Sequence, residues 1–212
     1  MPDIYQVNER YRNLLRARED SALAEMRRTY TVLQADNLQR LEEITQAIEE
    51  AQAAGEDVTG LNDFQVRLAA LNEQMARQVT EFAPRATDIA SNGQRSAIQL
   101  SLDMQESLVR AVAGVPDSVS MAIDLNWNRL PVEAITNVVG FAADGSPLGL
   151  LYEAIGPFAR DHVTIGVAQG LNPLQVARRM SKTYETLAPS RAATIARTEM
   201  IRANREAQRQ TF

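Results

Sequence analysis

The sequence predicts an all-α protein, with a long N-terminal helical hairpin or bundle followed by a small multi-helix C-terminal domain. Ala, Leu, Gln, Glu and Arg are abundant while aromatic residues make up only 5% of the chain, a balance that favours helices over sheets. Residues 7–54 contain neither Pro nor Gly, whereas seven of the ten Gly and six of the eight Pro lie from residue 114 onward. We therefore expect a long-helix, coiled-coil-like region over 1–113 and a compact helical domain over 114–212.

The first long helix is predicted by an eleven-residue spacing of apolar side chains. One register holds Tyr11, Ala22, Leu33 and Ile44, and a second holds Ile4, Leu15, Met26 and, after a gap at Asn37, Ile48. This spacing gives 3.67 residues per turn and keeps a stripe on one face of a nearly straight helix. Part of that stripe is expected to pack on another long helix or on a partner chain, self-association included.

A break at Gly55–Gly60 is expected to lead into a second helix that starts near Asp63. Its apolar positions are Phe64, Leu68, Leu71, Met75, Val79 and Phe82. Pro84 either kinks this helix or starts a new one. A third helical stretch follows, with an interruption expected near Ser91–Gly93, and the arrangement predicted is an antiparallel hairpin or three-helix bundle.

Beyond Gly114 the pattern predicts short helices separated by turns. The helices expected are Val119–Leu125, Pro131–Phe141, Leu148–Ile155, Pro157–Gln169, Pro173–Tyr184 and Pro189–Arg209. Tight turns are expected at 144–147 and 170–173, with Asn172 capping the helix that follows. Trp127 is interpreted as a buried ring with a hydrogen-bonded N–H rather than as a platform for stacking bases.

The last helix carries an unusual mixture of side chains on one side. The residues that recur there at three- and four-residue steps are Ala192, Ile195, Thr198, Glu199, Arg202 and Glu206. We expect a half-buried helix whose polar groups bond one another, with Glu199 reaching Arg202 and with Arg197 and Glu199 also paired to neighbouring helices. Thr198 is expected to bond back to the carbonyl of Thr194.

This helix carries a resemblance to a known family. Ala192–Met200, followed by Arg202-Ala-Asn-Arg-Glu-Ala, resembles the "IARTE…A…N" signature of the phage Mu F-like minor head (head morphogenesis) proteins. Residues 166–180 are similar to the turn and helix that lead into the signature, and a looser likeness begins at Asn128. Family domains usually continue into a small strand-containing segment, so we expect either a short member or a remainder beyond Phe212. Ile195, Arg197, Thr198, Glu199, Arg202 and Asn204 are the motif residues to which we assign a structural network.

The C-terminal part of the chain is basic, although the chain as a whole is acidic. The formal net charge is −5, yet residues 151–212 carry nine basic and five acidic side chains. Arg191, Arg202, Arg205 and Arg209 are candidates for contact with DNA or with an acidic portal surface. The alternative is a solvated helix face, and both interpretations stay open.

The residues offer little for catalysis, cofactor binding or metal binding, and we predict none of these. Cysteine is absent, and His162 is the single histidine, so neither a zinc site nor a nucleophile–histidine pair is expected. No GxSxG elbow or phosphate-binding loop occurs. Arg197–Glu199 lies in one helix without a glycine-lined pocket, which favours a structural role. Residues 1–5 predict no signal peptide, and no apolar run of 18 residues predicts a membrane span.

The resemblance implies a structural, non-enzymatic protein of the bacteriophage virion. We expect a minor head protein that associates with the portal or the capsid interior, is present in the host cytoplasm during assembly, and acts in head assembly and in DNA packaging or ejection. Contacts with packaged DNA would be non-specific and would weaken with salt. Two alternatives stay open: the helical delivery or adaptor half of a toxin-like effector, and a coiled-coil adaptor that dimerises through residues 7–54.

Overall fold

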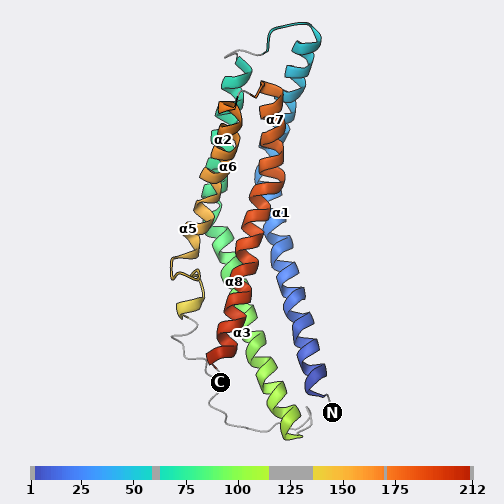
Figure 1. The fold of residues 1–212 in the computed structure, drawn as a ribbon, viewed down its shortest axis with the longest axis vertical. Coiled ribbons are helices and arrows are strands. Elements are labelled where there is room, and N and C mark those ends of the chain that lie inside the picture. The colour runs from blue at the N-terminus through green and yellow to red at the C-terminus, as the bar shows by residue number, and fades with distance from the viewer. Residues whose placement is uncertain (1–2, 59–62, 115–135, 170, 211–212) are drawn as a thin grey trace. The chain divides into compact units, whose positions relative to one another are not determined.

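A computed structural model describes residues 3–58, 63–114, 136–169 and 171–210, and it confirms the all-α fold. The helices are α1 (Ile4–Ala53), α2 (Asp63–Glu81), α3 (Ala83–Ala113), α5 (Leu148–Glu153), α6 (Ile155–Ala168), α7 (Pro173–Lys182), the π-helix η2 (Thr183–Leu187) and α8 (Ala188–Gln210) (Figure 1). Residues 136–138 are also helical. In this part of the chain there is no strand, only an isolated bridge between Phe141 and Pro147.

The described residues form two compact units. Unit 1 comprises those of Met1–Glu25, Thr87–Leu148 and Ile195–Phe212, and unit 2 comprises those of Met26–Ala86 and Gly149–Thr194. Each unit takes segments from both of the regions predicted from the sequence, 1–113 and 114–212, and the boundary between those regions stays a prediction.

The expected long helix is confirmed as α1, which spans 50 residues. In the two expected registers Tyr11, Met26 and Ile48 are buried, whereas Ile4 is exposed and the other members, Leu15, Ala22, Leu33 and Ile44, are half-buried. A third register with the same spacing, made of Glu19, Tyr30 and Leu41, is buried and was not predicted from the sequence. Asn37, the gap in the apolar pattern, is buried in unit 2, where its amide donates to Gln78 at 2.6 Å and accepts from Gln74 at 3.0 Å. The stripe therefore continues through Asn37 as a polar contact.

The second and third helices begin as predicted at Asp63 and beside Pro84. Pro84 is the second residue of α3, where its missing N–H removes no intrahelical bond. The interruption expected near Ser91–Gly93 is wrong, since α3 continues through these residues. A Cβ built on Gly93 would lie 2.7 Å from the Met200 sulfur, so this glycine permits a close approach of α8 to α3 within unit 1.

The C-terminal helices differ from the prediction at their ends. Residues 139–140 form a turn with Gly140 at φ +86°, so the helix expected over Pro131–Phe141 ends before Phe141. A turn at Ala154 ends α5, and α6 begins at Ile155 rather than at Pro157. Trp127 and the helix expected over Val119–Leu125 lie outside the described residues.

The turn and cap chemistry around α7 agrees with the prediction. Asn172 accepts from the Gln175 N–H at 2.9 Å while the Gln175 side chain accepts from the Asn172 N–H at 3.1 Å, which is a complete capping box. The turn at 144–147 places Gly145 at φ +80°, and Asp144 accepts from the Ser146 N–H at 3.0 Å.

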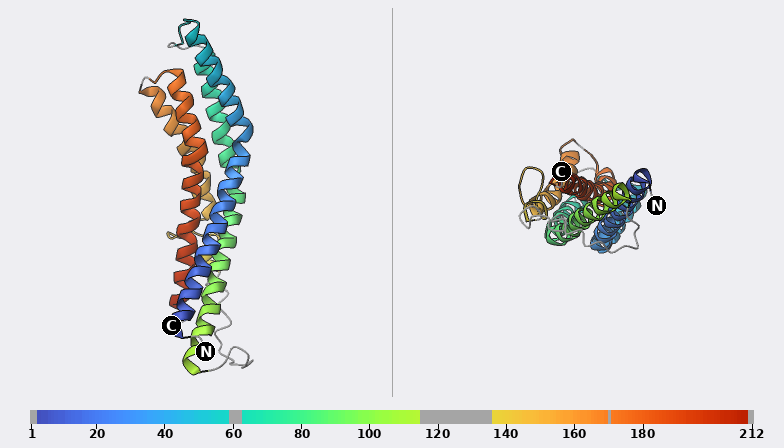
Figure 2. Two further views of the ribbon diagram at one scale, coloured as in Figure 1. Left: turned by 90° about the vertical axis from the view of Figure 1, so that its right-hand side faces the viewer. Right: turned by 90° about the horizontal axis from the view of Figure 1, so that it is seen from below.

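The break expected between Tyr184 and Pro189 is replaced by the π-helix η2. Figures 1 and 2 show α7, η2 and α8 following one another without a loop. The Ala188 N–H donates to the Thr183 carbonyl, five residues earlier. A proline in the next position has no N–H and would clash with a carbonyl in an unbroken α-helix, so the wider turn accommodates Pro189 without ending the helix.

Unit 2 contains most of the largest buried side chains. Met26, Tyr30, Ile48, Leu68, Met75, Tyr152, Ile155, Met180 and Tyr184 are all almost completely buried. The Tyr30 and Phe82 rings pack edge to face with their centroids 4.9 Å apart, which joins α1 to the end of α2. Burial raises the pKa of Tyr30 and of Tyr184 well above the ordinary value.

Candidate functional site

The site lies in unit 1, around the part of α8 that carries the predicted motif. The buried face of this helix is made mainly of small side chains, namely Ala192, Ala193, Ala196, Ala203 and Ala207, with Met200 among them. Small side chains allow close packing, and Ala203 and Ala207 form one cluster with Ile98 and Val138. The motif residues are therefore placed at the edges of a tightly packed helix face.

Glu199 and Arg202 form the expected pair. The Arg202 Nε donates to a Glu199 carboxylate oxygen at 2.7 Å, and only 6% of the Glu199 side chain is exposed. The same guanidinium donates to the carbonyl oxygen of Val138 at 3.4 Å and to that of Phe141. Arg202 thus links the α8 motif to the turn that follows residues 136–138, where carbonyl groups lack helical partners.

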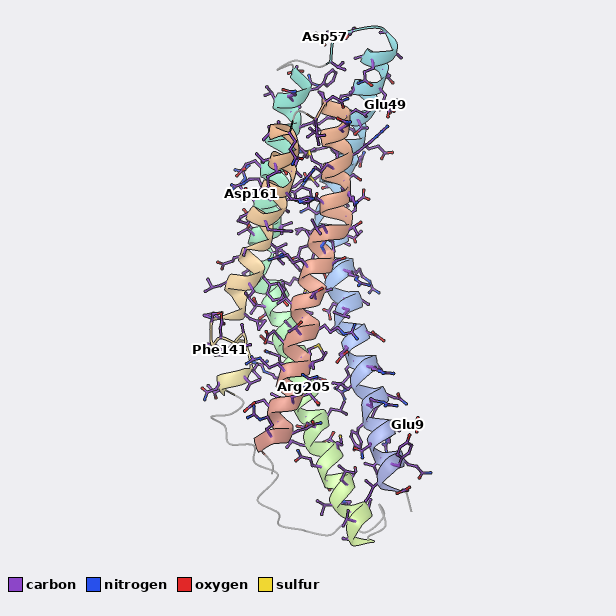
Figure 3. The ribbon with its side chains drawn as sticks, in the orientation of Figure 1. Glu9, Glu49, Asp57, Phe141, Asp161 and Arg205 are labelled. Atoms are coloured by element: carbon purple, nitrogen blue, oxygen red, sulfur yellow. The ribbon has the colours of Figure 1, made fainter. Side chains whose placement is uncertain are left out.

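Gln94 of α3 holds the same turn from another element. Its side-chain oxygen accepts from the Gly140 N–H at 2.8 Å, and its amide donates to the Phe141 carbonyl at 3.3 Å. Gln94 is fully buried, so these bonds satisfy a polar group that would otherwise destabilise the fold. Phe141 is labelled in Figure 3. The role of Gln94 was not predicted, because a single glutamine in a helix gives no signal of a distant partner.

Arg197 pairs with a neighbouring helix, as expected, and the partner is Glu19 of α1. The Arg197 Nε lies 3.5 Å from a Glu19 carboxylate oxygen, with the Arg197 side chain 59% exposed and the Glu19 side chain only 6% exposed. Burial raises the pKa of Glu19, while the positive charge of Arg197 acts in the opposite direction. The sequence analysis did not name Glu19 as a buried partner. Its eleven-residue spacing from Tyr30, and that of Tyr30 from Leu41, could have indicated a buried position.

Asn204 completes the network on the opposite edge of α8. It is buried, and its amide donates to the Ala97 carbonyl of α3 at 3.1 Å, while its side-chain oxygen accepts from Gln208 at 3.2 Å. Ile195 is half-buried and Thr198 is exposed. The bond to a carbonyl four residues earlier is made by Thr194, which donates to Ser190 at 2.9 Å, rather than by Thr198.

The four candidate arginines for DNA or portal contact have different surroundings. Arg205 and Arg209 are exposed in unit 1, and Arg209 lies 3.5 Å from Glu206. Arg191 is exposed in unit 2, where its guanidinium carbon lies 4.2 Å from the centre of the Phe158 ring. Arg202 is bound internally as described above, which makes Arg205, labelled in Figure 3, and Arg209 the candidates on the surface of unit 1.

The geometry of this network suits holding helices together. Both carboxylates, Glu19 and Glu199, face arginines, and neither lines the unit 1 cavity that Tyr11 and Leu100 border. Within the described ranges no group of three or more His, Asp or Glu side chains is arranged to hold a metal ion. His162 is half-buried in unit 2, and burial lowers its pKa, as do the nearby charges of Arg179 and Lys182.

None of the helices in the described part of the chain is both long and apolar enough to cross a membrane. The chain matches no family model, no curated protein and no solved structure.

Proposed function

We propose that this chain is a structural phage minor head protein that associates with the portal or the capsid interior and acts in head assembly and in DNA packaging or ejection. The resemblance of residues 192–207 supports the class. The observation that carries a structural role is the internal bonding of Glu199, Arg202 and Asn204, which fasten α8 to α3 and to the turn at 138–141. These side chains stabilise unit 1 by bonding one another and the backbone of neighbouring elements.

The exposed arginines of α8 supply the surface that would meet a partner. Arg205 and Arg209 can contact phosphates of packaged DNA or carboxylates of a portal surface, because a guanidinium binds both groups through paired N–H donors. Contacts with DNA would be to the backbone and would weaken steeply with salt.

The coiled-coil adaptor is less well supported than the head protein. Part of the α1 stripe that would form a dimer seam is already covered within the chain, with Tyr11 packed in unit 1 and Met26 and Ile48 buried in unit 2. A dimer through that stripe would require these contacts to open.

The test is quantitative mass spectrometry of gradient-purified procapsids and virions, with this chain counted against the portal subunit. Retention at a low copy number comparable with that of the portal is the expected result. Absence from both particles would overturn the proposal and favour the toxin carrier or the free adaptor.

A double charge reversal on α8, with a single reversal elsewhere as control, tests whether the α8 arginines form the docking surface. The double variant Arg205→Glu/Arg209→Glu should lower incorporation into procapsids, whereas Arg95→Glu, which makes one such change on an exposed face of α3, should not. Equal incorporation of all three proteins would exclude these arginines from the docking surface.

A further inference from the structure

Unit 2 contains an apolar cavity between α2, α6 and α7 that the network of α8 does not use. Its volume is about 370 Å³, within the range of sites that hold small molecules. The apolar lining is formed by Val66, Leu68, Ala69, Val163, Val167 and Val176. Val66 and Val167, at 63% and 44% exposed, give the cavity an apolar mouth.

The cavity follows from the way α2 and α6 pack. These helices lie side by side, and near the start of α6 Gly156 touches the backbone and side chain of α2, where a Cβ would overlap Thr80 and the Ala76 carbonyl. Further along the pair, Ala69 and Val167 are too short to fill the space between the helices. A close contact at one end and short side chains at the other therefore leave an opening.

Hydrogen bonds between elements hold the walls in place. The Asn72 amide donates to the Arg160 carbonyl of α6 at 3.3 Å, and the Asn72 side-chain oxygen accepts from the Tyr184 hydroxyl at 2.8 Å. Arg179 of α7 donates to the His162 carbonyl of α6 at 2.8 Å. Tyr184 lies in the π-helix, a distortion that often occurs at functional sites. The cavity is thus preformed.

The polar part of the lining carries charges of both signs. Arg160 lies 3.8 Å from Glu73 and 3.1 Å from Asp161, and the side chains of Arg160 and Glu73 are 43% and 49% exposed. Figure 3 labels Asp161 on α6. A ligand head that both donates and accepts can bind between Glu73 and Arg160, whereas a charged head would meet a like charge at close range.

We propose that this cavity binds a small amphiphile with a linear apolar body and an uncharged head, such as a hydroxyl or a primary amide. At about 30 Å³ for each water-sized group, the volume holds on the order of ten non-hydrogen atoms. The apolar body lies among the valines, and the head donates to Glu73 and accepts from Arg160. This site is independent of the proposed role in the phage head.

The test uses 1-octanol, octanamide, octanoate and octylamine as probes, with titration of the full chain followed by NMR. Saturable binding of octanol and octanamide at one site is expected, with octanoate and octylamine weaker by about tenfold. Glu73→Gln should reduce the discrimination against octanoate, because it removes a negative charge from the rim, and should leave octanol binding in place.

Blocking variants separate the cavity from general hydrophobic binding. Ala69→Trp places a large ring at the mouth and should abolish binding, whereas Ala70→Trp, at an exposed position that does not line the cavity, should leave it unchanged. Circular dichroism confirms that both variants remain helical, and Thr164→Trp repeats the test from α6. Absence of saturable binding for all four probes, or equal binding by the Ala69→Trp and Ala70→Trp variants, would overturn the proposal.

Discussion

Glu199 shows how a charged side chain can be placed on a buried helix face. Its carboxylate is stabilised by Arg202, and removal of that arginine would leave a buried charge without its partner. Arg202→Met should therefore lower the free energy of unfolding by about 3 kcal/mol. The measurement is urea unfolding followed by far-ultraviolet circular dichroism.

The control for this substitution is Arg209→Met, which also removes a positive charge, in this case from the i,i+3 pair of Arg209 with Glu206. The Arg209 side chain is 80% exposed, so the change should stay below about 0.5 kcal/mol. Equal effects of the two substitutions would contradict the structural role assigned to Arg202.

Glu19 should give unit 1 a pH dependence of defined sign. Burial raises its pKa above the ordinary 4.5, so the folded state binds the proton more tightly than the unfolded state. The resulting stabilisation is present below pH 4.5 and is lost as pH rises through the raised pKa. The stability of the wild type relative to Glu19→Gln should therefore fall over that interval and then level off.

Urea unfolding of both proteins over a series from acid to neutral pH measures this difference. Arg16→Gln serves as a control, because it changes a charge near Glu19 without removing the carboxyl. A difference between wild type and Glu19→Gln that does not vary with pH would show that folding leaves the pKa of Glu19 unchanged.

Whether the partner of a motif residue could be predicted depends on how far away along the chain that partner lies. The Glu199–Arg202 pair could be predicted because i,i+3 neighbours on a helix must lie together. The partner of Arg197 could not be named, since the tertiary fold alone brings Glu19 to α8. The roles of Gln94 and Asn204 depend likewise on contacts between helices.

At the scale of helices, two glycines differ in whether the neighbouring atoms can move to make room for a Cβ. A Cβ at Gly93 would meet the flexible Met200 side chain, whereas a Cβ at Gly156 would overlap the Ala76 carbonyl of α2, which cannot move alone. Gly156→Ala should therefore destabilise the protein by about 2 kcal/mol through overpacking. Gly93→Ala should cost less, because Met200 can change rotamer and alanine favours the helix.

Thermal unfolding by calorimetry compares the two variants with the wild type. A larger loss for Gly93→Ala than for Gly156→Ala would show that Met200 is fixed and that α2 and α6 can separate.

Helix periodicity was a sound guide to α1 and α2, because apolar side chains that pack on one face must recur at helical spacing. The break predicted at Gly93 was wrong, because this glycine lies inside α3 and allows the Met200 side chain of α8 to approach closely. The break predicted before Pro189 was also wrong, since the π-helix accommodates a proline that an unbroken α-helix would exclude. Both errors came from residues that usually end helices.

At the scale of the whole molecule, each of the two compact units combines segments that lie far apart in the sequence. Unit 1 needs the start of α1, most of α3 and the end of α8, while unit 2 needs the rest of α1, α2, α6 and α7. The shift in Gly and Pro content near residue 114, from which a domain boundary was predicted, coincides with the end of α3 at Ala113. Composition records where a helix ends, and does not record which helices pack together.

This division makes a prediction about fragments. Residues 1–113 and residues 114–212 should each fail to unfold cooperatively alone, because both units lack a buried face in either fragment. An equimolar mixture should recover helical content and a cooperative transition, since the two fragments together supply every segment of both units. Circular dichroism and calorimetry of each fragment and of the mixture measure this, with the uncut chain as control. A fragment 1–113 that unfolds cooperatively alone would instead support the boundary predicted from composition.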